Sequence, residues 1–155
     1  MSTIFRHLNI MLVITILMEM MKMPEKPLIE RLKEYVNDEL SDSLYYDILS
    51  ERAPNEEQRE LLLEFSRNEK DHAETFARAI TMMTGKKYVL PFVNRPIVPS
   101  DYTEALKIRV INESGDFRKY GDEYLEATTP FLKNAFYKAR TDENVHALRI
   151  LYMLS

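Results

Sequence analysis

The chain has 155 residues, of which 45% are hydrophobic and 30% charged, with only three glycines and no cysteine. That length and composition suit one folded domain and exclude intrinsic disorder and collagen-like structure. The formal net charge is −4 and no run of Lys or Arg stands out, which argues against a nucleic-acid-binding surface. Without cysteine, these residues hold no disulfide, zinc finger or iron–sulfur cluster, which fits a reducing cytoplasm. Any metal must therefore be held by histidine and carboxylate.

Residues 1–24 are predicted to be an apolar N-terminal extension, with an apolar run from Ile10 to Met18. A membrane-spanning helix needs about 20 apolar residues, and no small-residue cleavage site follows the run. A membrane role and a secretory signal are therefore disfavoured. We interpret the extension as a helix that docks on the domain or on a partner subunit. Alternatively it reflects the choice of start site, because four methionines near its end could each begin a shorter chain.

Residues 25–155 are predicted to form one helical domain, because apolar residues recur at steps of four and three. The first helix is expected from Pro27 to about Arg52. Asn55 caps a second helix, which reaches Thr84 with a glycine directly after it as the stop. Two neighbouring antiparallel helices with a short connection form a helix hairpin.

A second hairpin follows the only long irregular stretch, residues 86–99, which carries three prolines. Ser100 or Asp101 caps a third helix that runs to about Ala127. A Thr-Pro pair at 129–130 begins the fourth helix, with proline in its tolerated first turn. Two short connections on either side of one long crossover predict an all-α four-helix bundle made of two hairpins.

The two predicted hairpins are related by an internal duplication. When the sequence is shifted by 74 residues, chemically identical residues align without a gap. The aligned pairs include Leu32 and Leu106, Val36 and Val110, Glu39 and Glu113, Asp42 and Asp116, Tyr46 and Tyr120, Glu69 and Glu143, and His72 and His146.

Each predicted helix has its apolar face interrupted by acids at the same level, and the second and fourth helices add a histidine three residues after a glutamate. A buried, unpaired carboxylate costs several kcal/mol. Four glutamates that converge on one level of a core therefore need cations. The residues of this level are Glu39, Glu69, His72, Glu113, Glu143 and His146.

The spacing of these residues suits two divalent metal ions. Residues i and i+3 share a helical face, so Glu69 and His72 can reach one ion together, and the Glu-x-x-His pair of the fourth helix can reach the other. Glu39 and Glu113 are then placed to bridge or to cap the ions. Oxygen-rich sites with some imidazole favour iron or manganese over zinc.

Four further residues near this level have open roles. Asp42 and Asp116 lie one turn after the glutamates of the first and third helices, and each is either an extra ligand or a hydrogen-bond acceptor for a ligating histidine. Tyr46 and Tyr120 lie two turns after the same glutamates. Core packing explains them as well as a role in proton transfer does.

The segments NDELSDSLYY and RNEKDHAETF resemble the first half of a rubrerythrin, and INESGDFRKY and TDENVHALRI resemble the second half. The resemblance spans residues 28–154 and implies a ferritin-like fold with two iron ions per chain, with manganese as an alternative. It implies ligand roles for Glu39, Glu69, His72, Glu113, Glu143 and His146. It adds Asp116, which stands where rubrerythrins often carry one more glutamate.

The resemblance is to short rubrerythrins without a rubredoxin domain, because paired C-x-x-C motifs are missing. It implies a peroxide reductase that takes electrons from an external donor such as rubredoxin, with Tyr46 and Tyr120 as candidate catalytic residues. Ferroxidase or iron-handling activity and di-iron hydroxylation are alternatives. A helical interaction module with a structural metal is the non-enzymatic alternative. Because duplicated hairpins can exchange between chains, we expect a homodimer, and a domain-swapped homodimer is one way to form it.

Overall fold

The computed structural model describes residues 26–155, so the predicted extension over residues 1–24 lies outside the described part. Within residues 26–155 there are four helices and no strand, which confirms the all-α fold class. The helices are α2 (Leu28–Ser50), α3 (Glu56–Thr84), α4 (Tyr102–Glu126) and α5 (Pro130–Met153). None of these four helices combines the length and the hydropathy that crossing a bilayer requires.

The predicted helix boundaries agree closely with the observed ones. The first helix ends two residues early, at Ser50, because Arg52 begins a tight turn in which its N–H donates to the Leu49 carbonyl at 3.0 Å. The predicted caps are present: the Asn55 side chain accepts a hydrogen bond from the Gln58 N–H at 2.9 Å. Gly85 ends α3 with a φ of 68°, a conformation that favours glycine.

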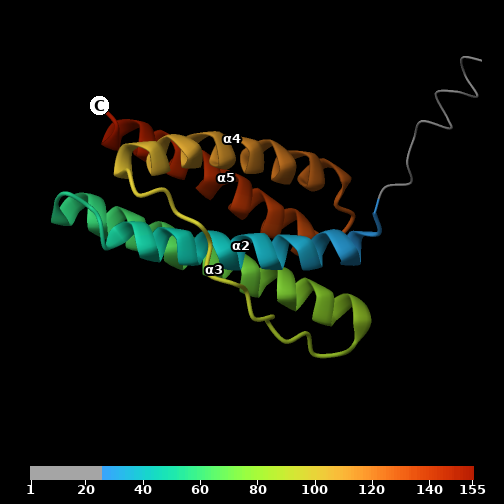
Figure 1. The fold of residues 1–155 in the computed structure, drawn as a ribbon. Helices are drawn as coiled ribbons and strands as arrows, with labels where there is room; N and C mark the ends of the chain where they lie inside the picture. Colours follow the sequence, from blue (N-terminus) through green and yellow to red (C-terminus); the bar gives the residue numbers. More distant parts are fainter. Residues whose placement is uncertain (1–25) are drawn as a thin grey trace, which may run out of the picture.

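The helices pack as two hairpins, α2 with α3 and α4 with α5 (Figure 1). The crossover between α3 and α4 runs back along the molecule, so these two helices point the same way and each hairpin partner points the other way (Figure 1). α3 and α5 also contact each other between the hairpins. This packing directs one face of every helix toward a shared core.

The core consists of two apolar clusters with a charged layer between them. The charged residues interrupt each helix between the two clusters, as the residue order shows: Glu69, for example, lies between Phe65 of one cluster and Phe76 of the other. Large buried residues of the first cluster are Leu32, Val36, Phe76, Ile80, Tyr120 and Phe136. Those of the second are Tyr46, Leu49, Leu62, Phe65, Leu106 and Ile150.

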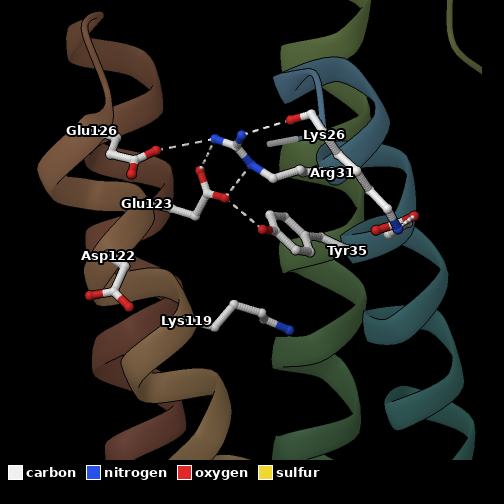
Figure 2. A pocket seen from close by; sticks show the side chains of 8 residues that line it. Lys26, Arg31, Tyr35, Lys119, Asp122, Glu123 and Glu126 are labelled. Carbon is white, nitrogen blue, oxygen red and sulfur yellow. Dashed lines mark hydrogen bonds and ion pairs between the residues drawn. The ribbon is translucent and has the colours of Figure 1, made fainter. Parts of the chain in front are cut away.

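A buried carboxylate ties the two hairpins together near the start of α2 (Figure 2). Glu123 of α4 accepts hydrogen bonds from the Arg31 guanidinium at 2.6 Å and 3.0 Å and from the Tyr35 hydroxyl at 2.6 Å. Both donors come from α2. A bidentate, charge-assisted contact of this kind fixes the position of α2 relative to α4 and also stabilises the fold.

Substitution of Tyr35 by phenylalanine is expected to lower the free energy of unfolding by about 1–3 kcal/mol, because Glu123 then loses a buried donor. Urea titration followed by circular dichroism measures the change. Tyr137→Phe is the matched control, since Tyr137 is 56% exposed. If the two variants are equally stable, the contact with Glu123 contributes nothing to the packing of the hairpins.

Candidate metal centre

The duplicated acids and histidines meet in the middle of the bundle, between the two apolar clusters. They form two overlapping groups, and within each group the ligand atoms lie within 4.8 Å of one another. All of them are buried, with at most 4% of any residue exposed. The first group is Glu39, Glu69, His72 and Glu143, and the second is Glu69, Glu113, Glu143 and His146.

The first group converges on one nitrogen atom. His72 Nδ1 lies 3.1 Å from Glu69 Oε2, 3.3 Å from Glu39 Oε2 and 3.4 Å from Glu143 Oε1. A single N–H cannot donate well to three carboxylates at once. A cation surrounded by these four groups, in contrast, can contact the imidazole and all three carboxylates at once.

The second group repeats this arrangement around His146, whose Nδ1 lies 3.1 Å from Glu69 Oε1, 3.2 Å from Glu113 Oε2 and 3.5 Å from Glu143 Oε2. Glu69 and Glu143 therefore each turn one oxygen to His72 and the other to His146. These two carboxylates are shared between the groups. Of the two roles expected for Glu39 and Glu113, the geometry favours capping, since each belongs to one group only.

Burial and hydrogen bonding divide the four glutamates into two kinds. Burial raises the pKa of Glu39 to about 8 and the pKa of Glu143 well above its usual range. Burial also opposes ionisation of Glu69 and Glu113, but the neighbouring His146 and His72 outweigh it at Glu69, and the Arg109 charge outweighs it at Glu113, so the pKa of each of these two is lowered. Without metal, two of the four carboxyl groups thus hold protons near neutral pH.

The two histidines carry protons in the same metal-free state. Burial lowers the pKa of an imidazolium, but around His72 and His146 the hydrogen bonds to surrounding carboxylates prevail and raise the pKa of both well above the usual range. Protons therefore occupy the places that metal cations would take. A metal ion that binds here must displace them.

The chemistry of these side chains fits a pair of divalent ions. One oxygen of each shared carboxylate, Glu69 Oε1 and Glu143 Oε1, is buried and has a histidine nitrogen nearby, at 3.1 Å and 3.4 Å, but no donor of the described chain meets it in hydrogen-bond geometry. Buried polar atoms rarely lack a hydrogen-bond partner unless a bound ligand or ion supplies the missing contact. Four carboxylates and two imidazoles form the donor set that iron and manganese prefer, whereas structural zinc takes fewer ligands.

The two candidate catalytic tyrosines link the hairpins across this layer. Tyr46 of α2 donates its hydroxyl hydrogen bond to Glu113 of α4 at 2.5 Å, and Tyr120 of α4 donates to Glu39 of α2. Burial raises the pKa of both phenols well above the usual range, so both remain protonated. Each tyrosine thus holds a capping glutamate in place.

The structure does not bring Asp42 or Asp116 into either group. Asp42 accepts two hydrogen bonds from Arg109, at 2.6 Å and 2.8 Å, and Asp116 pairs with Lys119 at 2.6 Å. Lys119 lies one turn after Asp116 on the same helix, so a local ion pair takes up this carboxylate. Neither aspartate is the partner of a histidine, the other role expected for them.

Three residues that contact the centre were not assigned a role from the sequence. Arg109, only 2% exposed, forms an ion pair with Glu113. His72 Nε2 lies 2.9 Å from Asp142 Oδ2, and His146 Nε2 lies 3.2 Å from the Asn68 amide nitrogen. A signal for the last two exists in the sequence, because Asn68 and Asp142 directly precede the shared glutamates and align under the shift of 74 residues.

Comparison with known protein families finds a match over most of the chain. The sequence model described as Rubrerythrin covers residues 30–154, which is most of the chain and includes every residue of both groups. Comparisons with curated proteins and with solved structures returned no match.

Proposed function

The chain belongs to the rubrerythrin family of ferritin-like, di-iron carboxylate proteins, and on that basis we propose that it is an oxidoreductase that reduces hydrogen peroxide to water. The observation that carries the proposal is the pair of carboxylates, Glu69 and Glu143, that face both histidines. In two-metal sites, groups shared by both ions hold them close enough to act on one small substrate.

The metal ligands in this proposal are Glu39 and His72 at one position, Glu113 and His146 at the other, and Glu69 and Glu143 at both. When bound, two ferrous ions supply the two electrons that, with two protons, convert one hydrogen peroxide into two water molecules. The apolar clusters on both sides of the centre limit the access of water. Side reactions of the reduced metal with solvent are thereby restricted.

Tyr46 and Tyr120 have a proton-handling role in this proposal. Each phenol holds its proton at neutral pH because burial raises its pKa, and each contacts a capping glutamate rather than bulk water. A carboxylate that gains or loses charge during the reaction can exchange a proton with the phenol next to it.

The proposal includes partners. This sequence contains no cysteine for a rubredoxin iron, so the electrons are proposed to come from a donor outside these residues, such as rubredoxin. We further propose two iron ions per chain, with manganese as an alternative, a cytoplasmic location, and a homodimer that is domain-swapped in one form. Residues 25–155 are the proposed catalytic domain and residues 1–24 an extension to it.

The activity is tested with protein loaded anaerobically with ferrous iron and mixed with hydrogen peroxide in a stopped-flow spectrometer. We expect peroxide consumption and oxidation of bound iron at least about 100-fold faster than the same concentration of free ferrous ion. The matched control is the Glu143→Gln variant at equal total iron. A wild-type rate no faster than that of free ferrous ion would refute the peroxidase function.

One observation favours di-iron hydroxylation as a second candidate. A pocket of about 310 Å³ opens beside His72, and its apolar walls include Phe76, Phe131 and Ala135. Such a pocket suits a small apolar substrate more than peroxide. If oxygen rather than peroxide oxidises the bound iron quickly, and an apolar compound added at the same time is hydroxylated, this candidate replaces the first.

A further inference from the structure

The two metal positions differ in their surroundings although the ligands themselves are duplicated. We name them the His72 position, with Glu39 as its capping glutamate, and the His146 position, with Glu113. Under the shift of 74 residues the six ligands align with identical residues, and so do Tyr46 and Tyr120, but other residues that contact the ligands align with residues of a different type. Two of these contacts change the electrostatics of one position relative to the other.

The first difference lies behind the histidines. The nitrogen of His72 that faces away from the carboxylate cluster contacts a carboxylate, Asp142, at 2.9 Å. The corresponding nitrogen of His146 contacts a neutral amide, Asn68, at 3.2 Å. A carboxylate that accepts the N–H of a ligating imidazole makes the other nitrogen a stronger donor to the metal. The Asn68 group that faces His146 is the amide nitrogen, which is itself a hydrogen-bond donor and does not accept that N–H.

The second difference lies on the capping glutamates. Glu113 forms an ion pair with the buried guanidinium of Arg109, which places a positive charge directly on a ligand of the His146 position. Within residues 26–155 no guanidinium contacts Glu39; the nearby Lys119 is paired with Asp116 at 2.6 Å. The residue that aligns with Arg109 is Tyr35, whose hydroxyl points to Glu123 instead (Figure 2).

Neighbouring charges offset these differences only in part. Arg109 is itself neutralised by Asp42, but its guanidinium still lies on Glu113 Oε1, the oxygen that also accepts the Tyr46 hydroxyl. Asp142 lies 4.0 Å from the Lys138 ammonium, whose side chain is 59% exposed. An exposed ammonium at that distance is screened by water and salt.

Both differences favour metal binding at the His72 position over metal binding at the His146 position. We propose that the two positions are unequal: the His72 position takes the first divalent ion and holds it more tightly, and the His146 position takes the second and releases it more readily. The residues that set this order are Asp142, Asn68 and Arg109, none of which the geometry makes a ligand. The inference rests on the metal centre of the proposed function but not on its reaction with peroxide.

The order is tested by titrating the metal-free protein with Mn²⁺ and following the electron paramagnetic resonance signal of the free ion. Wild-type protein is expected to bind in two steps, the first at least about tenfold tighter than the second. Asp142→Asn gives both histidines an amide partner and is expected to weaken the first step about 10- to 100-fold. Asn68→Asp gives both histidines a carboxylate partner. It is expected to tighten the second binding step, which reduces the difference in affinity between the two steps.

Asp71→Asn is the matched control for Asp142→Asn, because it removes the same charge from an exposed position beside His72 in the sequence. It is expected to leave both steps unchanged. Two equal steps in the wild type, or a first step that Asp142→Asn changes no more than Asp71→Asn does, would overturn the inference. Those results would leave the peroxidase proposal standing, whereas two unequal steps without peroxide reduction would remove the proposed function and leave the inference intact.

Discussion

Replacement of Glu143 by glutamine is expected to reduce bound iron from about two ions per chain to well under one. Glu143 turns one oxygen toward each histidine, so both metal positions depend on it. An amide has one carbonyl oxygen and no charge, and therefore cannot serve both. Elemental analysis after anaerobic ferrous loading and gel filtration measures the loss.

The same substitution is expected to change the stability of the metal-free protein by no more than about 1 kcal/mol. Burial raises the Glu143 pKa so far that the carboxyl group is neutral without metal, and glutamine imitates a neutral acid in shape. Loss of metal without loss of stability therefore separates a ligand from a structural residue.

Two further variants make the result specific. Glu39→Gln alters a residue of only one group and is expected to remove about one ion rather than two. Glu126→Gln removes a charge from a side chain that is 56% exposed and remote from both groups, and is expected to bind iron like the wild type. If Glu143→Gln and Glu126→Gln hold equal iron, the shared-carboxylate arrangement is wrong.

Removal of metal is expected to make the protein markedly less stable at alkaline pH. Burial raises the pKa of Glu39 to about 8 and the pKa of Glu143 well above its usual range, while an unfolded glutamate titrates at about 4.3. A raised acid pKa contributes stability that is complete below the unfolded pKa and is lost as the pH rises through the folded pKa. The raised pKa values of His72 and His146 act in the same direction above about pH 6.5.

Metal-free protein should therefore lose stability progressively between about pH 5 and pH 9. Metal-loaded protein should not, because the cations replace the protons and bind more tightly as the pH rises. At free metal about 1,000 times its Kd, binding adds about 4 kcal/mol, or about 8–16 °C in Tm for a chain of this size. Thermal melts at three pH values, with and without a chelator, measure this difference. A metal-free melting temperature that increases from pH 6 to pH 9 would contradict the assigned protonation.

The sequence was sufficient to predict the helices and the level of the bundle at which the acids meet. Both follow from local patterns: helical spacing of apolar residues, caps such as Asn55 and Gly85, and the repeat that aligns Glu39 with Glu113. These patterns do not depend on how the helices pack against one another, so they can be recognised in the sequence alone.

The roles within the centre could not be derived in the same way. Which glutamates are shared depends on how α3 approaches α5, and that is set by the packing of two hairpins rather than by spacing along one helix. Asp42 aligns with Asp116, yet one binds Arg109 across the hairpins and the other binds Lys119 on its own helix. Identical positions in a repeat thus acquired different partners.

Neither hairpin can assemble a metal position alone, because the His72 position needs Glu143 and the His146 position needs Glu69. An ancestral single hairpin would therefore have gained the centre only by pairing with a copy of itself about a twofold axis, with one shared glutamate from each copy. In such a pair every substitution appears twice, so the two ions are equivalent by symmetry. Fusion of the copies into one gene removed that constraint, and Asn68 could then diverge from Asp142, and Tyr35 from Arg109.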